Sequence, residues 1–264
     1  MTAGSPGEQP TTINLGGGFV FLRRVDGHAA IVVSSIAGTG AIGMMSAADV
    51  DARADDSLRQ WLQWWAFPDH ARIRRVNQVH GGRVVSASSY NGGAPDADGV
   101  WTRDSSDLLV IRAADCAPVW IVDPPHKTIA LVHAGWRGVT ADIIEHALEA
   151  LESAGAHRED LHAAIGPHIG PCCFEVGPEV SALFLDDVGA VGEPSLLVVE
   201  RKRADGVSLD LGAAIEHRLI AGGVSDARID AADACTRCHK DLLHSYRRNG
   251  TGGPLMAAIA AVLP

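Results

Sequence analysis

The stretch LLVIRAADCAPVWIVDPPHKTIALVHAGWRG, residues 108–138, decides the fold of this chain. It contains three apolar runs, at residues 108–111, 119–122 and 128–132. Each run is apolar throughout rather than at alternate positions, which is typical of strands buried on both faces. Pro124-Pro125 marks a turn between the second and third runs. The stretch therefore predicts three central strands, with polar residues at their ends where a site can form.

Helices are predicted as well as strands. Residues 141–153 form an amphipathic pattern with apolar residues at helical spacing, and residues 46–66 carry tryptophans on one helical face. Residues 255–263 read as a last, fully apolar strand. We therefore predict an α/β fold of layered, mixed β-sheets flanked by helices. It forms a single domain over residues 15–264, preceded by a flexible N-terminal tail at residues 1–14.

The composition indicates a soluble globular protein. Of its 264 residues, 47% are hydrophobic and 20% are charged, which is enough for a sizeable core. The net charge of −10 argues against a nucleic-acid binder, because phosphate neutralisation needs a basic surface. The sequence has neither a membrane-span-length apolar run nor a signal pattern at its start. We expect a cytoplasmic protein, monomeric or weakly homo-oligomeric, that acts on a small molecule.

Two residue types that bind zinc stand at the ends of the apolar runs. Cys116 and His133 are 17 positions apart (133 − 116), and His80 lies upstream in the string NQVHG. Two imidazoles and one thiolate suit Zn²⁺, and a fourth position left open would make the metal catalytic. The alternative is that Cys116 and His133 are ordinary buried residues at strand ends.

Several strings recur in this order in one protein family. They are NQVHG (77–81), ADC (114–116), HAGWRG (133–138), IGPHIGPCCFEV (165–176) and SYRR (245–248). On these strings the chain closely resembles the laccase-domain family, also called the polyphenol oxidase or purine nucleoside phosphorylase family, which includes the bacterial peptidoglycan-editing factor. The resemblance covers about residues 15–264. The two longest strings, HAGWRG and IGPHIGPCCFEV, are too specific to match by chance.

The resemblance implies a four-layer fold like that of cysteine hydrolases, and a zinc enzyme. The family's zinc triad matches His80, Cys116 and His133 without substitution, so these three are expected to be metal ligands and catalytic residues. The implied reaction splits adenosine, inosine or methylthioadenosine with phosphate, giving the base and ribose 1-phosphate. Adenosine deamination is the implied side activity.

Further site residues are expected around this triad. Glu175 is a candidate general acid or base, and Asp115 is either another or a group that orients a ligand. The remaining candidates bind substrate: Gln78, Asp98, Arg137, Cys172 and Arg247.

The arginines have the clearest chemistry among these candidates. A guanidinium meets phosphate oxygens with two parallel hydrogen bonds, and Arg137 stands just before a predicted helix N-terminus that also suits an anion. Arg248 fits ordinary surface pairing better. The arginine that relatives carry after Gly252 is absent here, which weakens the expected affinity for phosphate or indicates a different substrate.

Other functions stay open at this point. Without a metal, Cys116 and His133 would make a cysteine nucleophile with its base, as in a hydrolase that edits peptidoglycan precursors. The family's older label implies a copper-dependent polyphenol oxidase. The sequence lacks the His-x-His strings of a multicopper site, although a thiolate and two histidines can bind one copper ion. A zinc ion with a purely structural role is the plainest alternative.

The cysteines are expected to be reduced or metal-bound. There are five, an odd number, and a secreted disulfide framework is normally smaller and evenly paired. The string CTRCH (235–239) has the spacing of a c-type haem attachment site, but haem attachment requires export. Relatives carry the first cysteine, so Cys238 reads as a local addition. A second zinc site here lacks a convincing fourth ligand.

Overall fold

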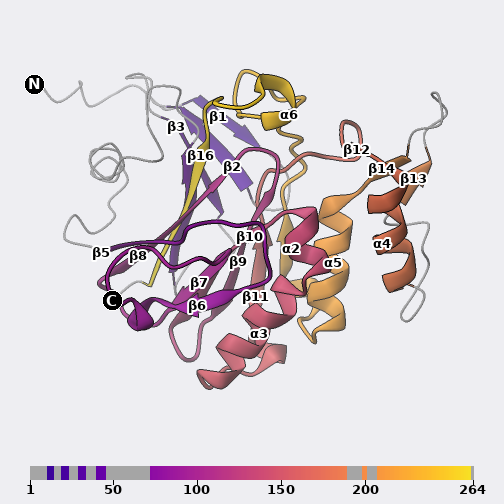
Figure 1. Ribbon diagram of the computed structural model, residues 1–264. Helices are drawn as coiled ribbons and strands as arrows, with labels where there is room; N and C mark the ends of the chain where they lie inside the picture. The colour runs from indigo at the N-terminus through magenta and orange to yellow at the C-terminus, as the bar shows by residue number, and fades with distance from the viewer. Residues whose placement is uncertain are drawn as a thin grey trace, which may run out of the picture.

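A computed structural model describes residues 11–14, 19–23, 29–33, 40–45, 72–188, 198–200 and 207–262. Within these residues the chain forms two large β-sheets and one small one, and helices pack against one face of the second large sheet (Figure 1). The helix predicted over residues 46–66 lies outside the described residues. Among the described residues, no helix is long and apolar enough to cross a membrane.

The first sheet has seven strands. In spatial order they are β1 (Thr11–Asn14), β2 (Phe19–Arg23), β3 (Ala29–Val33), β4 (Gly40–Met45), β16 (Met256–Val262), β8 (Asp107–Ala113) and β5 (Arg72–Arg75). Every pair is antiparallel except β5 with β8. The strands predicted at residues 108–111 and 255–263 are therefore confirmed as β8 and β16.

The first strand of this sheet begins inside the predicted N-terminal tail. Thr11–Asn14 form β1 and pair with β2, although residues 1–14 were expected to be a flexible tail. β-Branched residues favour strands, and three of the four residues of β1 are β-branched. The prediction of a tail therefore applies to residues 1–10, which lie outside the described residues.

The second sheet has six strands. Their spatial order is β15 (Ile229–Ala231), β11 (His162–Ile165), β9 (Ala117–Asp123), β10 (Thr128–Ala134), β7 (Gly99–Thr102) and β6 (Val84–Ser86). The central strands β9 and β10 form an antiparallel hairpin and are buried along their whole length. These are the second and third strands predicted from the continuous apolar runs.

The two sheets stack, and the helices lie on the far face of the second. Alternate residues of β9 point to opposite sides: Trp120 packs towards the first sheet, while Val119 and Ile121 pack towards the helices. The indole N–H of Trp120 also donates to the carbonyl of Ile259 in β16 at 2.9 Å, which joins the layers. The described residues form three layers, namely the first sheet, the second sheet and the helices. They do not include the fourth layer that was predicted.

The helices and the small sheet follow in the chain. The helices are α2 (Trp136–Thr140), α3 (Ile143–Ser153), α4 (Pro178–Val188), α5 (Leu211–Ala221) and α6 (Tyr246–Asn249). The small sheet has the order β12 (Glu175–Val176), β14 (Val207–Leu209), β13 (Val198–Glu200). Glu175 was expected to open a helix, but it lies in β12, because Pro178 supplies the helix start two residues after the strand ends.

The predicted helix over residues 141–153 begins later than expected. Asp142 has a left-handed backbone (φ 57°) and separates the short helix α2 from α3, which begins at Ile143. The first turn of α3 does not line the main cavity described below, so the expected anion site at its N-terminus is wrong. Arg137 reaches that cavity from α2 instead.

Candidate metal centre and active site

Three residues expected to bind a metal meet at one end of the second sheet. The ligand atoms of His80, Cys116 and His133 all lie within 4.8 Å of one another. The two imidazole rings are 4.9 Å apart between centroids and meet edge to face. Burial rises from His80, which is exposed, through Cys116 to His133, which is buried. The group therefore opens to solvent on one side only.

The register of the central hairpin explains why Cys116 and His133 meet. His133 pairs with Pro118, so Cys116 stands opposite Gly135, just beyond the ladder. A Cβ atom added to Gly135 would lie 2.7 Å from the sulfur of Cys116, so a side chain at this position would press on the sulfur. The glycine of the HAGWRG string therefore leaves the room that the thiol occupies.

His80 arrives from the neighbouring sheet. Strands β5 and β8 are parallel, so the residues after β5 leave the sheet at the same end as Cys116, which follows β8. Gln78 fixes this segment: its side-chain amide donates to the carbonyl of Arg112 at 2.7 Å and accepts from the N–H of Arg112 at 2.8 Å. His80 itself has a positive φ of 60°.

Asp98, fully buried directly before β7, holds the two histidine segments together. One carboxylate oxygen accepts the His133 Nδ1 hydrogen bond (2.9 Å) and the backbone N–H of His80 (2.9 Å). The other accepts the backbone N–H groups of Val79 (3.1 Å) and Gly81 (2.7 Å). Burial acts to raise the pKa of Asp98, but these hydrogen bonds outweigh it and lower the pKa. Asp98 is therefore an anion that directs the Nε2 atom of His133 away from itself.

Cys116 and His133 each stabilise the charged form of the other. Burial disfavours the thiolate, but the adjacent His133 charge and hydrogen bonds from both histidines lower the pKa of Cys116 to about 6. Burial likewise disfavours the imidazolium, yet Cys116 and Asp98 raise the pKa of His133 to about 9. Near neutral pH the pair without a metal is thus a thiolate beside an imidazolium, and the thiolate is the form that binds metals.

The donor set fits a metal ion. A thiolate and two imidazoles lie close enough to share one ion, and a carboxylate on the remote nitrogen of His133 is the usual support for a metal-bound histidine. Zinc prefers these ligands, and such a set also accepts copper.

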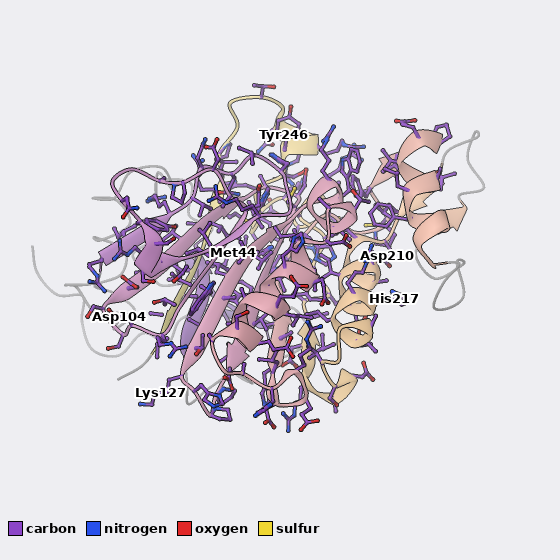
Figure 2. The ribbon with its side chains drawn as sticks, turned by 60° about the horizontal axis from the view of Figure 1, so that its bottom comes forward. Met44, Asp104, Lys127, Asp210, His217 and Tyr246 are labelled. Atoms are coloured by element: carbon purple, nitrogen blue, oxygen red, sulfur yellow. The ribbon has the colours of Figure 1, made fainter. Side chains whose placement is uncertain are left out.

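A cavity of about 600 Å³ opens over this group. Its size suits a small organic molecule. Polar groups stand at its floor and aromatic side chains at its walls. The lining residues that matter for its chemistry are His80, Cys116, His133, Arg112, Arg137, Arg247, Trp136, Phe174 and Tyr246. Figure 2 shows Tyr246 at one end of the molecule, opposite Lys127 in the turn between β9 and β10.

Two of the predicted arginines line the cavity. The guanidinium of Arg137 lies over the Trp136 ring, 4.2 Å from its centroid. The Arg247 guanidinium lies 5.6 Å from the Phe174 centroid and donates to the carbonyl of Glu175 at 3.1 Å. Both side chains are therefore held by an aromatic face beside the cavity.

The sequence did not single out Arg112. It also lines the cavity, and its signal was a charged residue that directly follows the apolar run 108–111 within strand β8.

Asp115 joins the walls of the cavity to its floor. Its side chain accepts a hydrogen bond from the Thr236 hydroxyl at 2.5 Å and from the backbone N–H of Arg247 at 2.6 Å. Its φ of 101° is rare for a residue with a side chain, and the chain crosses here from β8 in the first sheet to β9 in the second. The Asp115 carboxylate therefore fixes the segments that carry Thr236 and Arg247, and its predicted role of orienting a metal ligand stays a prediction.

Three predicted site residues lie away from the cavity surface. Glu175 is exposed on β12, and only its carbonyl contacts Arg247. Asp98 is fully buried behind His133, so its partners are protein groups. Cys172 is exposed and belongs to a separate group of cysteines. None of the three lines the cavity. Arg248 binds backbone carbonyls, as expected for a structural residue.

The family model, the curated relatives and the solved structures that match this chain point to the same family. Residues 31–262 match the family model described as multi-copper polyphenol oxidoreductase laccase. Purine nucleoside phosphorylase YlmD of Geobacillus stearothermophilus is 34% identical over 224 residues, covering 79% of this chain and 80% of the relative. Adenosine deaminase RL5, from an unknown prokaryotic organism, is 32% identical over 168 residues, covering 64% of this chain and 63% of the relative. The crystal structure of YlmD from G. stearothermophilus superposes with a TM-score of 0.77 at 26% identity, covering 92% of this chain and 96% of that one.

The class of protein is defined by these features: it is a layered α/β protein with a His–Cys–His group of possible metal ligands in a cavity of small-molecule size. The family match spans most of the chain. The chain therefore belongs to the laccase-like polyphenol oxidoreductase family, as its sequence strings predicted.

Proposed function

We propose that this protein is a zinc-dependent purine nucleoside phosphorylase with adenosine deamination as a side activity. The observation that carries the proposal is the content of one cavity. A His–Cys–His group stands at its floor, and arginines on aromatic faces stand at its walls. Relatives named purine nucleoside phosphorylase and adenosine deaminase support the choice of substrate.

The metal would be held by His80, Cys116 and His133. A zinc ion held there would supply Lewis acidity to the bound substrate. Copper is less well supported as the working metal. Among the described residues, only this one group of possible metal ligands contains histidine, whereas multicopper chemistry needs several ions close together.

The remaining groups would bind and orient the substrates. Arg137 and Arg247 bind phosphate through paired hydrogen bonds, and the aromatic walls cover the faces of the purine and exclude water. A phosphate oxygen then forms a bond to C1′ of the ribose while the glycosidic bond breaks. The electron pair of that bond stays with the base, which takes up the proton that hydrogen phosphate loses as it becomes the ribose phosphate ester. Asp98 keeps the His133 ring fixed throughout.

The test is the release of free base from adenosine, inosine and methylthioadenosine, with and without phosphate. Arg137→Ala should reduce the phosphate-dependent rate by roughly 30- to 1000-fold, since one lost charge-assisted contact in the transition state is worth about 2–4 kcal/mol. Its zinc content should stay unchanged. Arg103→Ala is the matched control, because Arg103 is exposed, lies outside the cavity and binds the carbonyl of Ala154.

Two results would count against the proposal. If the wild-type protein releases no base from any of the three nucleosides, the nucleoside assignment fails. If Arg137→Ala lowers phosphate-independent deamination as much as base release, there is no separate phosphate subsite.

A hydrolase acting on peptidoglycan precursors is the second candidate. Asp98 is hydrogen-bonded to His133, and His133 lowers the pKa of the Cys116 thiol. This chain of a carboxylate, an imidazole and a thiol is typical of a cysteine nucleophile with its base. Metal removal distinguishes the two functions. Chelation should abolish the zinc-dependent reaction, whereas a Cys116 nucleophile would keep its activity, or gain it, after chelation.

A further inference from the structure

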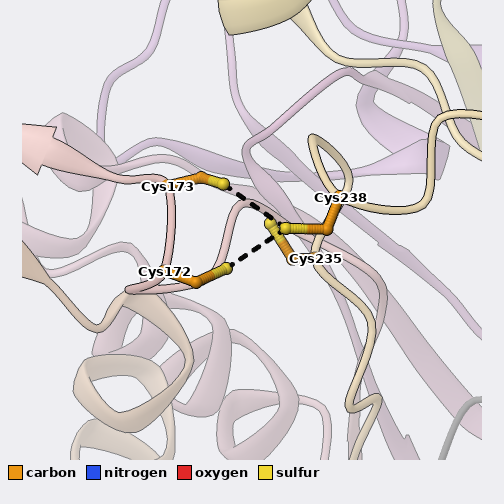
Figure 3. A group of neighbouring side chains, drawn as sticks. All are labelled: Cys172, Cys173, Cys235 and Cys238. Atoms are coloured by element: carbon orange, nitrogen blue, oxygen red, sulfur yellow. Dashed lines mark hydrogen bonds between the residues drawn. The ribbon is translucent and has the colours of Figure 1, made fainter.

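A second group of metal-type ligands lies apart from the cavity. The sulfur atoms of Cys172, Cys173, Cys235 and Cys238 all lie within 4.8 Å of one another. Figure 3 shows the four side chains pointing to a common centre from two separate loops. The Cys238 sulfur is 3.5 Å from that of Cys172 and 3.4 Å from that of Cys173. The expectation that a second zinc site lacks a fourth ligand is therefore wrong, because the fold brings four cysteines together.

We propose that these four cysteines bind one Zn²⁺ ion as a closed, tetrahedral structural site. Zinc–thiolate bonds of about 2.3 Å place neighbouring sulfurs of a regular tetrahedron about 3.8 Å apart. The two sulfur–sulfur distances given above are close to this value, so little movement is needed to enclose an ion. An iron–sulfur cluster fits poorly, because it places several irons and sulfides between the same thiolates and needs more widely spaced sulfurs.

Ordinary packing does not explain the group. Cysteines without a chemical role are usually buried as small apolar residues. Here Cys172 and Cys238 are exposed, and Cys173 and Cys235 are only partly buried. Four thiols also offer only weak hydrogen bonds to one another. A cation shared by four thiolates would bind them far more strongly than these contacts between sulfurs do.

The backbone presents the four sulfurs without help from a metal. The N–H groups of Cys238 and His239 both donate to the carbonyl of Cys235 (3.1 and 3.0 Å), so the Cys-x-x-Cys turn brings its two sulfurs to one side. The N–H of Cys173 donates to the carbonyl of Gly170 at 2.9 Å and closes the other turn. Cys235 also forms an isolated parallel bridge with His168, which sets the two loops side by side.

The charge around the group suits a zinc–thiolate centre. Four thiolates around Zn²⁺ carry two net negative charges. The turn itself contains Arg237 and is followed by Lys240, and the Arg248 guanidinium donates to the carbonyls of Thr236 (2.9 Å) and Arg237 (3.1 Å). Positive residues therefore lie in, directly after or in contact with the turn that carries Cys235 and Cys238.

The site would hold together two loops that lie next to the cavity. Phe174, directly after Cys173, lines the cavity, and Thr236, directly after Cys235, donates to Asp115 beside the His–Cys–His group. A zinc ion would therefore tie the wall that carries Phe174 to the wall that carries Arg247.

The test is metal analysis of full-length Cys116→Ala, purified without added metal. This variant lacks one ligand of the cavity group, so zinc that remains reports on the four cysteines whatever the fate of the proposed function. We expect about one zinc per chain, with X-ray absorption showing four sulfur ligands at about 2.3 Å. Adding Cys238→Ser should remove that zinc. Cys238→His should keep it, since histidine also binds zinc. His239→Ala should keep it, because His239 is not in the group.

Each other outcome overturns the assignment. Iron in place of zinc, zinc with fewer than three sulfur ligands, and no metal with five free thiols in the wild type are three such results. A disulfide among these cysteines, found in protein prepared without air oxidation, is the fourth. If Cys238→Ser does not fold, the absorption spectrum of Cys116→Ala and the behaviour of Cys238→His still decide the question.

Discussion

Replacing Asp98 by asparagine removes the negative charge of the carboxylate that binds both the His80 segment and the His133 ring. Asp98 accepts four hydrogen bonds, from His133 Nδ1 and from the backbone N–H groups of three consecutive residues, 79–81. Asparagine has almost the same shape, but one of its two terminal groups is an NH₂ that donates and cannot accept. Two of the four donors, of which the His133 group is buried and the backbone groups are partly buried, must therefore face another donor.

The size of the effect follows from these contacts. A buried donor without a partner costs about 1–3 kcal/mol, and partial burial lowers this cost, so two donors predict a loss of at most about 2–6 kcal/mol in the free energy of unfolding. Loss of a carboxylate behind a metal-binding histidine typically lowers metal affinity about 10- to 100-fold. We therefore expect Asp98→Asn to bind zinc about 10- to 100-fold more weakly than wild type at a temperature where both are folded.

The measurement is zinc affinity by competition with a chromophoric chelator, together with a denaturant unfolding curve. Asp96→Asn is the matched control. Asp96 is exposed and accepts from the side chain of Asn77 at 2.6 Å, so it joins the same two segments without touching the metal-type group. If Asp98→Asn binds zinc as tightly as Asp96→Asn, the carboxylate does not orient the ligand and the reasoning is refuted.

Two further predictions concern the thiol. Gly135→Ala places a Cβ atom 2.7 Å from the Cys116 sulfur, so we expect a loss of zinc from a folded protein, to be checked by elemental analysis beside circular dichroism. In chelator-treated protein, alkylation of Cys116 should increase with pH around a midpoint near 6, because its pKa is lowered to about 6 and only the thiolate reacts. The ordinary cysteine pKa is about 8.5, and a midpoint there, measured by peptide mass spectrometry, would contradict the predicted thiolate–imidazolium pair.

The centre of the fold could be predicted from the sequence because its signal is local. Strands buried on both faces must be apolar at every position, and β8, β9 and β10 are apolar enough to be read directly. The turn at Pro124-Pro125 then fixes the hairpin. Its register brings Cys116 and His133 together, as a spacing of 17 residues around one turn requires.

Other features depend on contacts that no local pattern records. The Asp98-Gly99 pair resembles a simple turn in the sequence, and its role becomes visible only when β7 pairs with β10 and places the carboxylate behind His133. Glu175 belongs to a family string, but the small sheet to which β12 belongs turns its side chain to solvent. Cys172 and Cys238 are 66 positions apart (238 − 172), so only the three-dimensional fold could show that they meet.

Strand direction explains why so much chemistry gathers at one edge of the second sheet. Strands β9 and β10 are antiparallel, so the start of β9, after Cys116, and the end of β10, at His133, share an edge. Antiparallel pairing of β10 with β7 adds Asp98, which directly precedes β7. Strand β11 runs against β9 and ends at the same edge, and its parallel neighbour β15 ends there too. The loops that follow β11 and β15 are the two that carry the four cysteines, so a metal at either group would stiffen the edge that supports the other.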